Sequence, residues 1–347
     1  MARLVMMWSA LLAFGFERSN AEPGAFAPGV SAPPTSAPIE AHLRGLTPPA
    51  RRDTLADVDL GPHAANPVFA DLIGTGVSVR DDFLRPLPAP SMADRLDAES
   101  QRAVMEQISD RNHPVEALVR RSIVAPFVLK IEAERRSKGA VLARRIDLWC
   151  IAYGELDLVS NETFLRELAG AMEEQEKDRL PSSSHFLEPP ELAKRELSVT
   201  KSREFDEAYV HVTFPLLERV HISATRRMIA TRTDESVVLA ARLDERFTRD
   251  AEFPNRWRPI RRDRVGKPLL GDAQPYAGAG FYLKITRLIE PEDALFVEYH
   301  QVFDEPQAWF GGTGLLRSKL PLVVQNTVRK FRRKLASASS GDAGPPR

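Results

Sequence analysis

The sequence predicts an α+β protein, in which a curved antiparallel sheet of about seven strands packs on a long C-terminal helix and on two or three other helices. Runs of alternating apolar residues dominate the chain between residues 120 and 303. Most of these runs follow one another across short turns, which favours antiparallel pairing over a parallel sheet. The last run, from 318 to 336, changes to a helical period.

Composition supports a folded core and excludes several classes of protein. The chain has 347 residues, of which 43% are hydrophobic and 28% are charged, so it is neither disordered nor collagen-like. Its 48 basic residues balance 48 acidic ones, so the overall charge does not favour nucleic acid as a partner. Because Cys150 is the single cysteine, an internal disulfide and a multi-cysteine metal cluster are excluded.

The first 21 residues predict a secretory signal peptide. Arg3 precedes an apolar run, Leu4–Phe16, and small residues at Ser19–Ala21 could form a cleavage site. An uncleaved anchor or a buried N-terminal helix is the alternative. The prediction is an exported protein, periplasmic or secreted, of a bacterial envelope. No second run reaches 18 apolar residues, so the mature chain is expected to lack a transmembrane span.

Proline-rich sequence from 22 to 90 predicts a largely irregular leader. Twelve of the 27 prolines lie between Pro23 and Pro90, and proline removes backbone donors and disfavours helix before it. Within the leader, Val68–Val79 could dock as irregular structure, but a chain starting near residue 65 or 85 is expected to melt at an unchanged temperature. Residues 91–336 are predicted to form one α+β domain, and 337–347 a disordered tail.

In the first half of the domain, helices precede and follow a strand pair. Ser91–Asp94 is typical of a capping box, with a helix to about Asp110, and Pro114 can open a second short helix. Residues 127–134 alternate as a strand, and Ile146–Tyr153 is apolar on both faces, as in a central strand. An acidic helix over 161–179 and a polar connection over 181–206 follow.

The second half is mostly strand. Alternating residues predict strands at 210–214, 220–231, 237–243, 281–289 and 295–303. Thr233–Ser236 is predicted to close a hairpin, and 245–278 to form a long basic loop. In the last helix Leu320, Val324, Val328, Phe331 and Leu335 share one face.

This arrangement resembles the helix-grip fold of START-type lipid-binding proteins over roughly residues 120–336, although the helix after the first hairpin departs from the usual order of that fold. The resemblance implies an apolar or amphipathic ligand between the sheet and the last helix. The residues expected to line such a site are Phe281, Leu283, Val297, Val324 and Phe331.

Catalytic motifs are weak, and no catalytic residue, cofactor or metal ligand is assigned. If position 290 pairs with 294, Lys284 faces His300 and Thr286 faces Glu298, a set that could do acid–base work or could be ordinary cross-strand pairing. A hydrolase without a recognisable motif is therefore a second alternative. His211 and His221 could meet on neighbouring strands, but two imidazoles make a poor metal site.

Basic residues gather in two parts of a neutral chain. The predicted anion- or surface-binding residues are Arg256, Arg258, Arg261, Arg262, Arg317, Lys319, Arg329, Lys330, Arg332 and Arg333. On an exported protein they favour an anionic lipid surface or an acidic polymer, but they could instead pair with the acidic helix at 161–179. The sequence thus predicts an exported soluble binding protein, with an envelope interaction or surface-association module without a small ligand as the first alternative.

Overall fold

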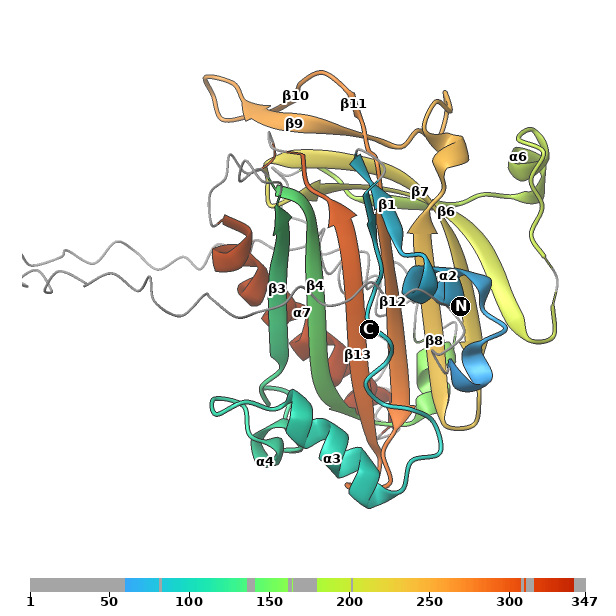
Figure 1. Cartoon of the computed structure of the whole chain (residues 1–347). Coiled ribbons are helices and arrows are strands. Elements are labelled where there is room, and N and C mark those ends of the chain that lie inside the picture. The colour runs from blue at the N-terminus through green and yellow to red at the C-terminus, as the bar shows by residue number, and fades with distance from the viewer. Residues whose placement is uncertain are drawn as a thin grey trace, which may run out of the picture.

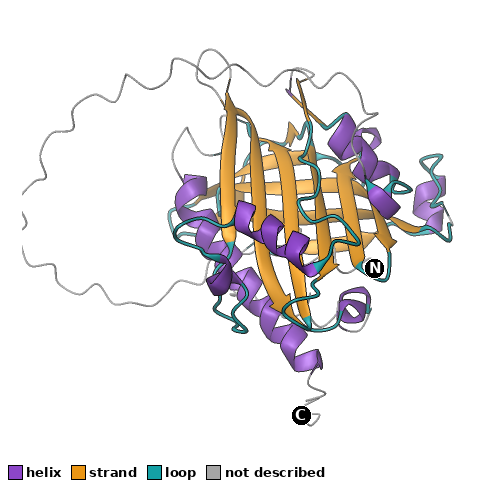
Figure 2. Ribbon diagram, turned by 60° about the horizontal axis from the view of Figure 1, so that its bottom comes forward, coloured by secondary structure: helices purple, strands orange, loops and turns teal. Residues whose placement is uncertain are grey.

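The computed structural model describes residues 60–80, 83–135, 141–161, 164, 180–200, 202–306, 309 and 315–339. It confirms the α+β class: an 11-stranded sheet carries a long C-terminal helix (Figure 1). All pairings between its strands are antiparallel. Figure 2 shows one set of strands crossing behind another, so the sheet curves back over itself.

The elements follow one another from a small N-terminal layer into the large sheet. Helices are α2 (Pro67–Gly74), α3 (Ala98–Ile108), α4 (Val115–Leu118), α6 (Pro189–Ala193) and α7 (Leu315–Ser339), with short 3-10 turns η2 (Gly61–His63), η4 (Leu156–Ser160) and η5 (Glu245–Phe247). β1 (Val77–Val79) and β2 (Phe83–Arg85) form a separate pair. The large sheet contains β3 (Val128–Arg135), β4 (Val141–Tyr153), β5 (Ser183–Phe186), β6 (Phe205–Leu216), β7 (Val220–Arg232), β8 (Ser236–Leu243), β9 (Arg256–Arg262), β10 (Pro268–Leu270), β11 (Gln274–Pro275), β12 (Ala279–Arg287) and β13 (Ala294–Asp304).

Strand β4, which lies between β13 and the last strand of the sheet, β3, is covered on both faces, as its apolar sequence predicts. Leu148 and Cys150 belong to the core that includes α7, whereas Trp149 and Ile151 belong to a core formed with α3 and α4. Successive side chains of a strand point to opposite faces, so each face of β4 needs its own apolar cover. In Figure 1, α7 runs behind the strands, while α2 and β1 lie in front of them.

The α7 side holds the main core. Leu320, Val324, Val328, Phe331 and Leu335 are all buried there, which confirms the predicted apolar face of this helix. At the end of β4, Gly154 has φ +150°, and a Cβ at this position would lie 2.6 Å from Cγ of Leu335. Glycine therefore allows the helix to approach the backbone directly.

On the opposite face, residues 60–80 and 83–90 include regular elements packed on the sheet, which corrects the predicted irregular leader for the part described. Phe69 and Leu72 of α2 are fully buried against the sheet, in a core shared with Ile229 and Tyr282. The prolines misled the prediction because Pro67 occupies the first turn of α2, where its missing N–H costs nothing. The predicted signal peptide, 1–21, lies outside the described residues.

Other boundaries also differ from the prediction. Helix α3 begins at Ala98 with Asp97 as its N-cap, because Ser91–Asp94 bind the sheet instead. The predicted loop 245–278 contains η5, β9, β10 and β11. The acidic helix predicted over 161–179 falls almost entirely outside the described residues. None of the described helices is long and apolar enough to cross a membrane.

Candidate functional site

The face of the sheet toward α7 brings together the five residues predicted to line a ligand site. Phe281, Leu283, Val297, Val324 and Phe331 all lie in one hydrophobic cluster between the sheet and α7, and each is at most 2% exposed. The structure therefore brings these five residues together. They form part of a packed apolar core, and nothing in their geometry distinguishes ligand lining from core packing.

A buried arginine on the same face was missed by the sequence reasoning. Arg226 of β7 is 4% exposed and lies between Ala224 and Met228, both of which face the α7-side core. Its guanidinium carbon lies 5.6 Å from the ring centroid of Phe281 and 5.9 Å from that of Phe214. The alternation of β7 could have shown that this charge points inward with its apolar neighbours.

Aromatic side chains continue this environment, and together with Arg226 they form what we call the arginine–aromatic cluster: Arg226, Phe214, Trp257, Tyr276, Phe281, Tyr299 and Trp309. The rings of Phe281 and Tyr299 are 5.5 Å apart, and Trp309 contacts both Tyr276, at 5.5 Å, and Trp257, at 5.9 Å. These separations are those of attractive aromatic pairs. The cluster therefore encloses one guanidinium within apolar, polarisable walls.

Electrostatics in the arginine–aromatic cluster are dominated by burial. Burial lowers the pKa of the Arg226 guanidinium, because removing the cation from water disfavours its charged form. It also raises the pKa of the hydroxyls of Tyr276 and Tyr299. Tyr299 donates a hydrogen bond of 2.8 Å to Gln301 Oε1 on the same face of β13. The cluster therefore combines a buried guanidinium with phenol hydroxyls that stay neutral.

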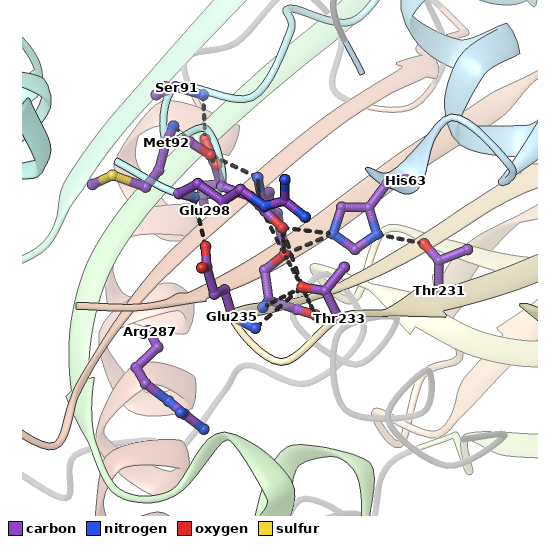
Figure 3. A network of polar contacts seen from close by, with 12 residues as sticks. His63, Ser91, Met92, Thr231, Thr233, Glu235, Arg287 and Glu298 are labelled. Carbon is purple, nitrogen blue, oxygen red and sulfur yellow. Dashed lines mark hydrogen bonds and ion pairs between the residues drawn. The ribbon is translucent and has the colours of Figure 1, made fainter. Parts of the chain in front are cut away.

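The opposite face carries a buried polar network beneath residues 91–95, shown in Figure 3. Lys284 Nζ lies 2.6 Å from Asp94 Oδ1 and donates a 2.7 Å hydrogen bond to the carbonyl of Met92. The Ser91 N–H donates to Glu298 at 2.7 Å. Burial favours the neutral acid, but hydrogen bonds from His63 and Lys284 hold the pKa of Asp94 well below its usual range.

His63, Ser236 and Asp94 sit close together, yet their order is not that of a nucleophilic triad. Ser236 Oγ donates to Asp94 at 2.8 Å and lies 2.6 Å from His63 Nε2, while Nδ1 of the same ring faces Thr231. In a triad the carboxylate holds Nδ1–H and leaves Nε2 for the serine. Ser236 is also fully buried, so this group acts as a clamp between the N-terminal layer and the sheet.

The residues of the last hairpin that could do acid–base work, Lys284, Glu298 and His300, lie in the same buried layer. Their cross-strand pairing differs from the predicted one. Lys284 lies opposite Glu298 and His300 opposite Tyr282, two residues away from the predicted register. The shift arises because the hairpin is centred one residue earlier, at 291 instead of 292: Arg287 pairs with Leu295. Burial would lower the pKa of His300, but its hydrogen bond with Asp147 and the nearby Glu298 raise it. Glu298 and His300 have no exposed surface, so no substrate can reach them in this structure.

The predicted surface cations do not form one surface. β9, with Arg256 and Arg258, pairs with the beginning of β7, at Val220–Ser223. The C-terminal end of α7 lies against Gly154, directly after the end of β4. Through β13, β12 and β8, this end of β4 is aligned with the end of β7. The two groups therefore lie at opposite ends of the sheet. Lys319 is partly exposed at the start of α7, and the side chain of Arg317 lies outside the described set.

Arg332 corrects the prediction for the α7 end. It is 4% exposed, and its guanidinium donates to the carbonyls of Ile151, Ala125 and Pro126. This side chain fixes α7 to β4 and cannot serve as a surface contact. Arg333 is exposed, whereas Arg329 and Lys330 are partly buried.

The remaining candidates are structural. Cys150 is buried and burial raises the pKa of its thiol, in keeping with an inert residue. His211 lies opposite Thr225 and His221 opposite Pro215, so the two imidazoles do not meet. Among the described residues, no group of three His, Cys, Asp or Glu side chains could hold a metal ion.

Comparisons with known proteins add little to this picture. No family model matches the chain, and no curated protein matches it. CalU16 from Micromonospora echinospora, a solved structure, is similar over 62% of this chain and 99% of CalU16, with 8% sequence identity and a TM-score of 0.19. A likeness of this size supports no statement about a ligand.

Proposed function

We propose that this chain is an exported binding protein that holds an amphipathic ligand with an anionic group between the sheet and α7. The observation that carries the proposal is the arginine–aromatic cluster, in which Arg226 is buried among rings on the α7-side face. The guanidinium presents a planar set of donors that matches a carboxylate or phosphate, and the aromatic walls suit an apolar chain. Localisation rests on the N-terminal sequence alone.

Binding rather than hydrolysis is supported by the position of the titratable groups. Glu298, His300 and Ser236 lie on the other face of the sheet, beneath residues 91–94, and are fully buried. A general acid or base must have a polar atom available to a substrate, whereas these groups are engaged inside the layer: Ser236 binds Asp94, Glu298 accepts a hydrogen bond from the Ser91 N–H, and His300 pairs with Asp147. We therefore assign these residues to the stability of the N-terminal layer.

A pair of ligands that differ only in charge tests the proposal. Oleate and oleyl alcohol would be titrated against the protein with Trp257 and Trp309 fluorescence as the signal, because both indoles belong to the cluster. We expect the carboxylate to bind at least roughly tenfold more tightly than the alcohol, since a charge-assisted hydrogen bond contributes about 1.5–3 kcal/mol. In Arg226→Gln this preference should disappear.

Controls separate binding from folding. Arg226→Lys keeps the charge but loses the planar fork, so it should retain part of the preference. Phe281→Leu keeps Arg226 and should lower the affinity for both ligands equally. Equal affinity for the two ligands in the wild type, or an unchanged preference in a folded Arg226→Gln variant, would contradict the proposal.

A further inference from the structure

The β9–β10 hairpin, defined as residues 256–270, lies at one end of the sheet (Figure 1). β9 runs from the sheet into a turn that Asp263 organises: its side chain accepts hydrogen bonds from the N–H groups of Val265, at 2.9 Å, and Lys267, at 2.8 Å. The single carboxylate of the hairpin is therefore engaged in its own turn. β10 is an edge strand of only three residues.

Aliphatic side chains are exposed on this hairpin. Val265 at the turn is 87% exposed, Leu269 is 51% exposed and Leu270 is 38% exposed. Leu269 and Leu270 are consecutive in β10 and therefore point to opposite faces, so together with Val265 at the turn they leave aliphatic surface on both faces of the hairpin. Such exposed aliphatic side chains suit a hairpin that enters an apolar interface rather than one that lies flat on a protein surface.

Basic side chains flank the aliphatic ones: Arg256, Arg258, Arg261, Arg262, Arg264 and Lys267. Arg261 lies directly opposite Leu269, and Arg262 opposite Pro268, so cations and apolar side chains share each face of the hairpin. Arg262 also forms an ion pair of 2.8 Å with Glu218. Burial lowers the pKa of the nearby His221, and the charges of Arg258 and Arg256 lower it further, as expected beside a positive surface.

We propose that the β9–β10 hairpin docks the protein on an anionic lipid surface, with Val265, Leu269 and Leu270 entering the interface and the arginines contacting headgroup phosphates and carboxylates. Cations close to an anionic membrane are attracted to it, and exposed aliphatic side chains gain by leaving water. Addition of a partner's strand is disfavoured because the edge offered by β10 is so short. Docking by the β9–β10 hairpin does not require the ligand site proposed between the sheet and α7.

Site-specific labelling tests the depth of this contact. Because the only native cysteine is buried, Val265→Cys creates one accessible thiol for an environment-sensitive nitrobenzoxadiazole label. The full chain would be mixed with vesicles of 30% phosphatidylserine in phosphatidylcholine, or of phosphatidylcholine alone. We expect a blue shift with the anionic vesicles only. Ile289→Cys is the matched control, because Ile289 is a 55% exposed aliphatic residue at the opposite end of the sheet, and its label should not shift.

Charge variants test whether the attraction is local. The triple variant Arg261→Glu, Arg264→Glu and Lys267→Glu should lower vesicle co-sedimentation at 50 mM salt by more than tenfold, since each effective cation changes partitioning roughly fivefold. The control triple Arg111→Glu, Arg120→Glu and Arg333→Glu changes net charge equally with exposed residues at the other end, and should retain most binding. Val265→Ser with Leu269→Ser and Leu270→Ser should weaken binding without altering its dependence on salt. Thermal melts would verify that each variant is folded.

Several outcomes would overturn the proposal. One is failure of the wild type to bind anionic vesicles at 50 mM salt, and another is an equal loss of vesicle binding in the two triple charge variants. A third such outcome is an equal blue shift of the labels at positions 265 and 289. Binding of the wild type to a soluble acidic polymer but not to vesicles would also overturn it, and would assign the hairpin to a polyanionic partner instead.

Discussion

At the scale of single residues, Lys284 illustrates how the fold accommodates charge. Its ammonium group lies fully inside the protein, between Asp94 and the carbonyl of Met92, and Glu298 lies opposite on the next strand. A buried cation is tolerated only when such partners neutralise it. The sequence placed Lys284, Glu298 and His300 on one face of a hairpin, which is correct, but it could not supply Asp94, because that partner is 190 positions away in the chain.

Removing the cation alone should therefore be costly. Lys284→Met leaves the charge of Asp94 buried without its main partner, and we expect a loss of about 3–5 kcal/mol in the free energy of unfolding. The double variant Lys284→Met with Asp94→Asn removes both charges and should recover part of that loss. Urea denaturation gives both values, with exposed Lys194→Met as the control. A Lys284→Met midpoint equal to that of the control would mean that the ion pair contributes nothing.

At the scale of elements, local periodicity succeeded where one element packs against one neighbour. The helical period of Leu320, Val324 and Phe331 predicted the buried face of α7, and the turn at Thr233–Ser236 was recognised from polar residues between two strands. It failed for β9, whose arginines interrupt the alternation of apolar residues even though Trp257 points into the core. It also failed for α2, because its apolar residues stand among prolines that sequence statistics associate with irregular structure.

Helix α7 offers a matched pair of substitutions. Phe331→Ala removes a fully buried ring and should cost about 3–5 kcal/mol, whereas Leu322→Ala, at a position 47% exposed, should change stability by less than about 0.5 kcal/mol. Chemical denaturation of the two variants measures the difference. If both variants unfold at the wild-type midpoint, α7 is peripheral to the fold, and the proposed ligand site beneath it would lose its cover.

At the scale of the whole molecule, the sheet is a central layer between two covers, α7 on one side and residues 60–118 on the other. Composition and pattern predicted the class, the α7 cover and the helices that form α3 and α4. The α2 and β1 part of the second cover was missed because its fit depends on side chains of β7, β8 and β12, which no local pattern reveals. The arginine–aromatic cluster was missed for the same reason, since it assembles residues from separate strands.

Truncation tests the second cover. A chain beginning at residue 86 lacks α2 and β1, including the buried Val68, Phe69, Leu72 and Val77, each of which contributes about 1.5–3 kcal/mol by burial. Compared with a chain beginning at residue 60, we expect its melting temperature to fall by more than roughly 10 °C, since about 1 kcal/mol moves a domain of this size by only a few degrees. Equal melting temperatures would restore the view that this region is a dispensable leader.

The clamp between the N-terminal layer and the sheet has a consequence for the order in which the chain can complete itself. Ser91 binds Glu298 across 207 positions, and His63 binds Ser236 across 173. Closing such long loops costs entropy before any contact is gained, which slows folding. A chain growing from its N-terminus therefore exposes His63 and Asp94 without their native partners until β8 and then β12, with Lys284, have been made. The part of the protein that is synthesised first is the part whose contacts are completed late.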